Sequence, residues 1–341
     1  MTSTAKRRWS RELENEVDGI AFGSSGPVLL HGYDPPAGGK WIDDVIPGKL
    51  GAFDRSTGER LWNAPCEVGY GRGFGAGIGQ QGQVIVLGPS QRGHRLVRMA
   101  VADGELLEAA DIQPFDCAIV ASDAVVCSNA RMVWAQDTLT LTEAWTYARE
   151  GERYHDVARL GDSVFVVVSN LESGKYGVVR LDAKLGNFKG NLVSLTLPLI
   201  RGICVTEDTV VLVTSELDMM LESDDRMDFM MRLASHPDEG LRDTLTLVGI
   251  RSTAAAGDAP LWYSILETKP IDDLPDVSVT ADSGKIYVER RAHLRALDAL
   301  TGRELGAWTV PGLDEKVAWS VVDGAGLLAE ETRVSIFELP A

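Results

Sequence analysis

The chain has 341 residues, of which 45% are apolar, so it is long enough to bury a continuous hydrophobic core. Its formal net charge of −17 argues against nucleic acid as a partner, because binding to phosphates depends on lysine and arginine. The same charge argues against an anionic membrane surface. No run of about 18 apolar residues occurs, so no membrane-spanning helix is predicted.

The N-terminus and the cysteines indicate the compartment. The first residues, MTSTAKRRWSRELENE, contain basic side chains without an apolar segment after them, so they do not form a secretory signal. Cys66, Cys117, Cys127 and Cys204 form no Cys-x-x-Cys pair and have no metal-ligand spacing. We therefore expect a cytoplasmic protein with reduced, buried thiols. The alternative is that Cys117 and Cys127 face each other across a hairpin.

Short, fully apolar segments follow small or acidic turn residues at seven points along the chain. They begin at residues 27, 83, 124, 163, 209, 285 and 325 and read PVLLHG, QVIVLG, AVVCS, SVFVVVS, TVVLVTS, KIYVER and AGLLAE. Continuous runs rich in Val and Ile are typical of strands covered on both faces. A propeller blade that lies between two neighbours provides this environment.

The spacing of these segments predicts the number of blades. Successive segments start 56, 41, 39, 46, 76 and 40 residues apart, and about 40–45 residues make a four-stranded blade. We therefore predict seven blades, in which an A strand precedes each apolar B strand and C and D strands follow it. The two long intervals predict insertions between the B and C strands of blade one, at 32–48, and of blade five, at 215–243.

One phrase occurs twice, as AFDRSTGERLW at 52–62 and as ALDALTGRELGAW at 296–308. In both places the phrase spans the end of a predicted C strand, a turn and the D strand. The last blade has a C strand near Arg333–Leu339 and no D strand after it. The segment Lys6–Leu13 carries Trp9 where a D strand would carry its tryptophan. We expect this segment to complete the last blade and to close the ring.

The phrase Ala-x-Asp-x-x-Thr-Gly-x-x-x-Trp resembles the repeat of the PQQ-like (quinoprotein-type, WD40-like) β-propellers. Together with the spacing, the resemblance implies one all-β domain over 1–341, a seven-bladed propeller of four-stranded antiparallel blades. In that family the tryptophan docks between neighbouring blades. We therefore interpret the D-strand tryptophans as packing residues, namely Trp9, Trp62, Trp145, Trp262 and Trp308.

The resemblance also raises a quinone-dependent enzyme. The quinoprotein alcohol dehydrogenases place two adjacent cysteines and a Ca²⁺ site beside their cofactor, and this chain has no adjacent cysteines. PQQ-dependent catalysis is therefore not expected, and we predict no cofactor. The outer-membrane assembly propellers of the family are exported lipoproteins, whereas no lipidation cysteine stands near the start of this sequence.

Two further patterns suggest chemistry but have structural explanations. The run Gly69–Gly79 lacks the preceding strand and following helix of a phosphate-binding loop. Glycine at every second position instead predicts one face of an A strand, at a crowded central channel. The five histidines, His31, His94, His155, His236 and His293, show no metal-ligand spacing. We predict no catalytic, cofactor or metal residues, although a triad assembled from distant blades stays open.

The insertions carry the functional prediction. Five of the eight methionines lie in the second one, on a segment that reads as a short amphipathic helix: Met219, Met220, Met227, Met230 and Met231. Methionine surfaces adapt to varied apolar partners. The first insertion contains Trp41 and Ile42. The alternative is that the helix simply packs on its own propeller.

Both insertions join B to C strands, so they belong on the same face as the D-to-A connections. Loops on a rigid scaffold are where binding residues concentrate. We therefore predict a non-catalytic binding or scaffolding propeller whose partner is another protein, contacted through the residues just named. The alternative is an enzyme or small-ligand-binding propeller with a polar site in the channel mouth, since propellers host both.

Overall fold

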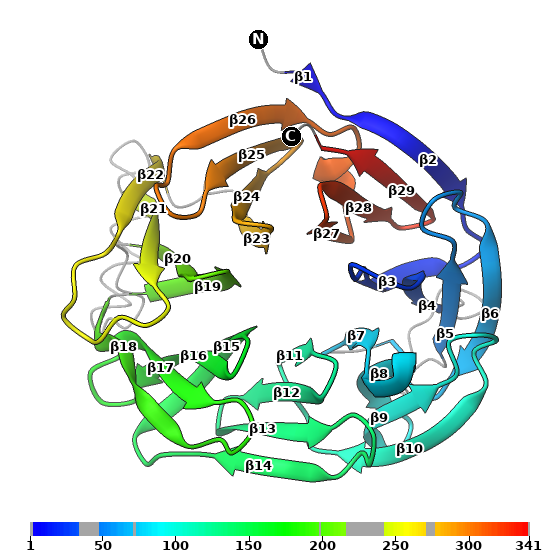
Figure 1. Ribbon diagram of the computed structural model, residues 1–341, viewed down its shortest axis with the longest axis horizontal. Coiled ribbons are helices and arrows are strands. Elements are labelled where there is room, and N and C mark those ends of the chain that lie inside the picture. The colour runs from blue at the N-terminus through cyan, green and yellow to red at the C-terminus, as the bar shows by residue number, and fades with distance from the viewer. Residues whose placement is uncertain are drawn as a thin grey trace, which may run out of the picture.

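The computed structural model describes residues 3–33, 48–70, 73–197, 199–215, 242–270 and 277–339. They form seven antiparallel sheets of four strands that stand around a central axis, as Figure 1 shows. Each sheet is one blade, with its strands in the order A to D from the axis outward. The seven-bladed β-propeller is therefore confirmed.

Blades one to four follow one another along the chain. Blade one consists of β3 (Glu16–Ala21), β4 (Val28–Tyr33), β5 (Gly48–Phe53) and β6 (Arg60–Cys66), and blade two of β7 (Gly75–Ile78), β8 (Val84–Ser90), β9 (Gly93–Met99) and β10 (Leu106–Ile112). Blade three consists of β11 (Cys117–Val120), β12 (Ala124–Asn129), β13 (Met132–Asp137) and β14 (Glu143–Tyr147). Blade four consists of β15 (Glu152–Leu160), β16 (Ser163–Asn170), β17 (Tyr176–Asp182) and β18 (Phe188–Leu197). In each blade the predicted apolar segment is the B strand.

Blades five to seven complete the ring. Blade five consists of β19 (Leu199–Thr206), β20 (Thr209–Ser215), β21 (Arg242–Arg251) and β22 (Trp262–Pro270). Blade six consists of β23 (Ser278–Asp282), β24 (Lys285–Arg290), β25 (His293–Asp298) and β26 (Glu304–Thr309), with β1 (Ser3–Thr4) as a fifth strand at its edge. Blade seven consists of β27 (Ala318–Val322), β28 (Ala325–Glu330), β29 (Arg333–Glu338) and β2 (Lys6–Glu12). Within the described ranges the helical elements are two short 3₁₀ turns, Gln80–Gly82 and Leu313–Glu315.

The hydrophobic core consists of seven clusters, one at each interface between neighbouring blades. The B strands supply the centre of these clusters because both of their faces are covered. In β16, six consecutive residues from Val164 to Ser169 are buried. The A strands contact one another around the whole ring, from β3 through β7, β11, β15, β19, β23 and β27 back to β3.

The D-strand tryptophans dock on the C–D turn of the next blade. Trp62 of blade one is 9% exposed, and its Nε1 donates a hydrogen bond of 2.8 Å to the carbonyl oxygen of Val101 in blade two. Its ring covers Gly104 of the same turn. Three other tryptophans dock in the same way, on the carbonyls of Arg55, Ala183 and Ala299: Trp9, Trp145 and Trp262.

The Asp and Gly of the repeated phrase build the turn on which the tryptophan rests. In blade six, Asp298 Oδ1 accepts hydrogen bonds from the amide and the hydroxyl of Thr301 at 2.8 and 2.7 Å. The bond from the hydroxyl is the main reason why the pKa of Asp298 is lowered. Gly302 follows with φ +68°, and a Cβ there would lie 2.6 Å from the ring of Trp262. The phrase is therefore structural, as interpreted.

Where the D-strand tryptophan and the turn glycine are missing, other apolar groups fill the same position between the blades. The D strand of blade two has no tryptophan, and the turn of blade three carries Leu141 at φ +54° in place of glycine. Leu141 is 4% exposed and lies in one cluster with Ile112. Blade seven has no C–D turn, so Trp308 of blade six instead shares a cluster with Ala5 and Leu339, near the two ends of the chain.

The N-terminal segment closes the ring, as expected. Strand β2 pairs with β29 in antiparallel register, with Trp9 opposite Ile336, and so forms the D strand of blade seven. Strand β1, which the sequence did not predict, pairs in parallel with β26 of blade six. Because β3 then begins blade one, residues 3–21 contribute strands to three consecutive blades (Figure 1).

Of the glycines in the run Gly69–Gly79, Gly75 and Gly77 lie on β7, the A strand of blade two, and their face meets the next A strand rather than a central channel. A Cβ on Gly75 would lie 3.3 Å from Ala118, and one on Gly77 would lie 2.8 Å from Val120. Both neighbours belong to β11. Glycine is therefore required because two A strands approach closely there.

All four cysteines are free. In the β11–β12 hairpin Cys117 lies opposite Ser128, and Cys127 lies opposite Ala118, so the two thiols are offset by one residue and point to opposite faces. Burial raises the pKa of Cys66 to about 11 and that of Cys204 to about 12. These two thiols therefore stay protonated at neutral pH.

A buried carboxyl group bridges three blades. Asp156 of β15 accepts hydrogen bonds from Cys117 Sγ of blade three at 3.0 Å and from the amide of Val157 at 2.9 Å. The amide of Ile203, in blade five, is a further donor. Burial nevertheless raises the pKa of Asp156, because a buried carboxylate loses its hydration.

Gly302→Ala tests the tryptophan docking. The new Cβ meets the ring of Trp262 and also needs a positive φ, so we expect the free energy of unfolding to fall by about 2–4 kcal/mol in urea denaturation. Gly324→Ala is the control, because Gly324 has the same φ of +68° with nothing within 4 Å of its Cβ position. It should lose only about 1 kcal/mol. Equal losses in both variants would contradict the docking.

Asp156→Asn tests the buried carboxyl group. A raised pKa means that the folded state holds the proton more tightly than the unfolded chain, so this contribution to stability declines as pH rises above the unfolded carboxyl value of about 4. We expect the variant to gain stability relative to the parent between pH 4 and pH 8, measured as urea midpoints. Asp182→Asn should show no such gain, because bonding to Lys189 lowers the pKa of Asp182, so the contribution of that carboxylate is lost only as pH falls below about 4 and stays nearly constant from pH 5 to pH 8. A constant difference between parent and Asp156→Asn would refute this assignment.

Candidate functional site

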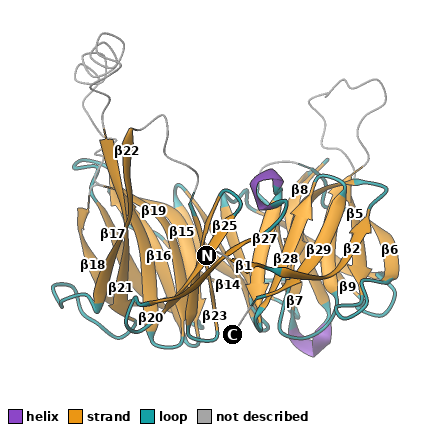
Figure 2. Ribbon diagram, turned by 90° about the horizontal axis from the view of Figure 1, so that it is seen from above, coloured by secondary structure: helices purple, strands orange, loops and turns teal. Residues whose placement is uncertain are grey.

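Two kinds of connection meet on one face of the ring: those from a D strand to the next A strand, and those from B to C within a blade. We call this the top face, and the A–B and C–D turns form the bottom face. Figure 2 shows the ring from the side, with the two faces at its upper and lower edges. The described histidines lie toward the top-face ends of their strands: His31, His94, His155 and His293.

The partner residues predicted from sequence lie outside the described residues. Trp41 and Ile42 fall in 34–47, and Met219, Met220, Met227, Met230 and Met231 fall in 216–241, with the predicted amphipathic helix. The flanking strands are described. Strand β4 ends at Tyr33 and β5 begins at Gly48, while β20 ends at Ser215 and β21 begins at Arg242. Both connections therefore leave the top face, and so does the one between β22 and β23.

The outer hairpin of blade five extends past the rest of its blade. Strand β20 pairs with β21 up to Ser215 opposite Leu245, whereas β21 continues to pair with β22 as far as Arg242 opposite Pro270. Figure 2 shows β22 rising at the top face. On the outer edge strand β22, Tyr263 and Ile265 are 66% and 68% exposed, more than the other large apolar side chains in the described ranges.

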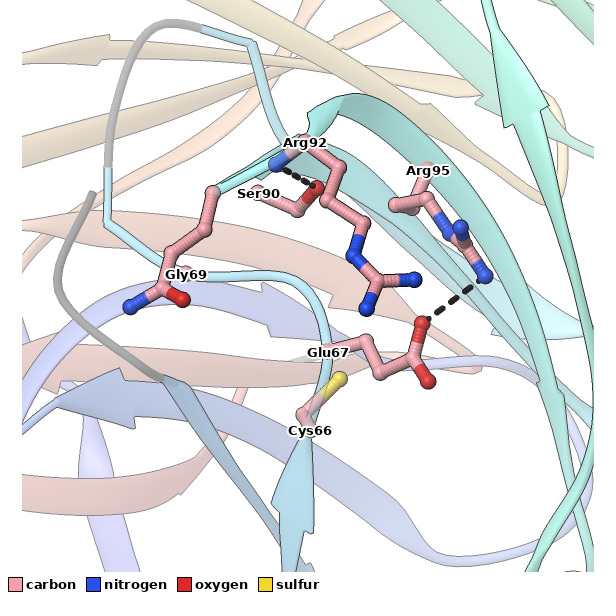
Figure 3. Close-up of a pocket in the computed structure, with 7 residues that line it drawn as sticks. Cys66, Glu67, Gly69, Ser90, Arg92 and Arg95 are labelled. Atoms are coloured by element: carbon pink, nitrogen blue, oxygen red, sulfur yellow. Dashed lines mark hydrogen bonds and ion pairs between the residues drawn. The ribbon is translucent and has the colours of Figure 1, made fainter. Parts of the chain in front are cut away.

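A polar pocket of about 260 Å³ lies on the top face between blades one and two (Figure 3). One wall is the D–A connection after β6, and the other is the B–C turn of blade two. The amide of Gly69 donates a hydrogen bond of 2.8 Å to the carbonyl of Pro89, which ties the two walls together. The lining residues are Cys66, Glu67, Gly69, Ser90, Gln91, Arg92 and Arg95.

The pocket offers two guanidinium groups. Arg95 is held between carboxylates, with Nη2 3.0 Å from Glu67 and Nη1 2.8 Å from Asp111. The exposed Arg92 reaches over the pocket toward Cys66 and Glu67, as Figure 3 shows. Because the thiol of Cys66 stays protonated, it is a poor nucleophile. The cationic groups of this pocket are the guanidinium of Arg92 and that of Arg95, the second of which is already paired with two carboxylates.

Both ring nitrogens of His31 are engaged in structural contacts. Its side chain is fully buried, with Nδ1 2.5 Å from Asp18 and Nε2 2.9 Å from the carbonyl oxygen of Val68. The ring also stacks on Phe74 at 4.7 Å. Since both nitrogens are engaged, neither can bind a metal or take a proton from a substrate. His31 instead anchors the D–A connection that forms one wall of the pocket.

His155 and Ser169 come nearest to a catalytic pair within the described ranges. His155 Nε2 lies 2.8 Å from Ser169 Oγ, and the ring packs on Tyr176 with centroids 5.0 Å apart. Burial, with a smaller effect from Arg153, lowers the pKa of His155. Ser169, however, is only 7% exposed. A substrate cannot reach this hydroxyl in the described arrangement, so the pair is structural here.

The described residues hold neither a cluster of metal ligands nor a membrane-spanning helix. No three His, Cys, Asp or Glu side chains among them gather as metal ligands. None of the helices in those ranges is long and apolar enough to cross a bilayer. Sequence reasoning missed Glu67, Arg92 and Arg95. The available signal was that Arg92 follows the second apolar segment directly, which places it in a B–C turn.

Comparisons with known proteins agree with this architecture. Residues 47–198 match a family model described as outer membrane protein assembly factor BamB. Curated protein sequences give no significant match. The chain is similar in structure to BamB from Moraxella catarrhalis, with a TM-score of 0.51, 14% identity and coverage of 98% of this chain and 100% of that chain.

Two other solved structures are similar. The Pan2 WD40 domain of Neurospora crassa has a TM-score of 0.59 and 11% identity, covering 99% of this chain and 98% of that one. The computationally designed Ika8 protein has a TM-score of 0.55 and 12% identity, covering 98% of this chain and 100% of that one. Identities this low show the fold alone. With the family-model match over residues 47–198, they confirm the resemblance seen in the repeated phrase: the chain has the β-propeller fold, and its repeats are similar to those of the PQQ-like family.

Proposed function

We propose that this propeller is a non-catalytic binding module that holds a protein partner on its top face. The observation that carries the proposal is that the two longest connections, 34–47 and 216–241, leave this one face of a closed ring. Binding residues concentrate on loops that a rigid scaffold positions. The matching family model is described as an assembly factor, which supports partner binding at that coarse level.

The finer parts of the proposal rest on sequence. We propose that the partner contacts Trp41 and Ile42 in the first connection and the methionines of the second one: Met219, Met220, Met227, Met230 and Met231. We also propose the cytoplasm as the location, supported by four free cysteines.

Site-specific photocrosslinking tests which face binds. A benzophenone amino acid replaces Leu171 in the B–C turn of blade four, and in a second variant it replaces Leu185 in the C–D turn of the same blade. The two leucines are 57% and 65% exposed, on opposite faces. In lysate of the source organism we expect discrete adducts from position 171 and none from position 185. Adducts from 185 alone would overturn the proposal.

A deletion tests the finer assignment. Residues 217–240 are replaced by a short Gly-Ser linker, and the crosslinked partner is then quantified by pull-down. We expect its recovery to fall at least tenfold while the urea midpoint of the ring stays within error. Unchanged recovery would remove the methionines from the partner site and leave the top face as the binding surface.

The pocket between blades one and two favours a second candidate function, the binding of a small anionic ligand. Arg92 and Arg95 are the observation behind it. In that case inorganic phosphate or citrate should bind in calorimetric titration, and Arg92→Ser should abolish the binding while the crosslinks at position 171 persist. An absence of heat with both anions would remove this candidate.

A further inference from the structure

A second hollow on the top face combines an apolar floor with basic groups. It has a volume of about 640 Å³ and lies over blades five and six. Its apolar lining comes from the D strand of blade five, the start of blade six, and the B and D strands of blade six: Leu266, Val277, Val288 and Ala307. We call it the blade-six groove.

The edge of the blade-six groove is basic, in a chain of net charge −17. Four cationic or titratable side chains within six residues line it: Arg290, Arg291, His293 and Arg295. The acidic groups nearby that the structure describes are largely engaged. Glu304 holds Arg295 at 2.6 Å, and the buried Glu289 pairs with Lys316 and Ser278. Asp314 also lines the groove.

Arg291 is the cation best placed for a partner. It stands with Ala292 in the two-residue B–C turn of blade six, where Arg290 pairs with His293. Its side chain is exposed, and no carboxylate in the described part of the chain forms an ion pair with it. The turn places Arg291 at φ +51°, a conformation that glycine adopts without strain.

We infer that the blade-six groove binds an extended acidic segment of a protein partner, with apolar side chains on the floor and carboxylates at Arg291 and its neighbours. This inference rests on the proposed function and gives the chemistry of the partner. Carboxylates form strong charge-assisted hydrogen bonds with guanidinium groups. Nucleic acids and anionic membranes also carry negative charge, but the net charge of −17 repels long polyanionic surfaces.

Arg291→Gly tests the inference without endangering the fold, because it removes the cation and relieves the positive φ together. The probe is a fluorescein-labelled synthetic peptide of repeating Asp-Leu-Glu, followed by fluorescence anisotropy. The parent should bind it, and more weakly as salt rises. The variant should bind about tenfold more weakly, which corresponds to about one charge-assisted hydrogen bond.

Gln81→Gly is the matched control. Gln81 has φ +58° in an A–B turn on the bottom face, so glycine relieves similar strain there without removing a groove charge. This variant should bind the probe like the parent, and a peptide with lysine in place of the acidic residues should not bind. Equal binding of the probe by parent and Arg291→Gly, or no binding by the parent, overturns the inference. Crosslinks at position 171 would still support the proposed function, so the two failures are distinguishable.

Discussion

The contact between a D-strand tryptophan and the C–D turn of the next blade organises this molecule. An indole ring covers a turn glycine, and its Nε1 reaches a carbonyl of the same turn, as Trp62 does at 2.8 Å from Val101. The fold requires an apolar group that fills the space between neighbouring blades at this point, and that group need not be a tryptophan. Leu141, in the C–D turn of blade three, fills this space against blade two, and its backbone adopts a positive φ there.

The closed ring also explains why His31 and Asp156 are engaged in structural contacts. Burying a polar group is unfavourable unless it finds partners, so inner-strand polar groups are matched across blades. His31 uses both ring nitrogens to hold a D–A connection, and Asp156 joins blades three, four and five. Because these groups hold the ring together, the binding that we propose falls on the connections of the top face.

Charge is distributed unevenly over the top face. The chain is strongly acidic overall, yet the two hollows described there are lined by arginines: Arg92 and Arg95 in one, Arg290, Arg291 and Arg295 in the other. Under the proposals made above, local guanidinium groups on an acidic background would favour short anionic groups, because the surrounding negative charge opposes extended polyanions.

The sequence by itself determined the period: seven apolar B strands, the order of strands in a blade, and the role of Trp9 in closing the ring. These follow from local chemistry, since burial on both faces selects apolar runs and tight turns select Asp and Gly. Only the tertiary structure decided which residues meet. The pairing of β1 with β26, the opposition of Gly77 and Val120, and the convergence of Glu67 with Arg95 join segments from different blades. No local pattern records such distances, because the curvature and twist of the whole ring set them.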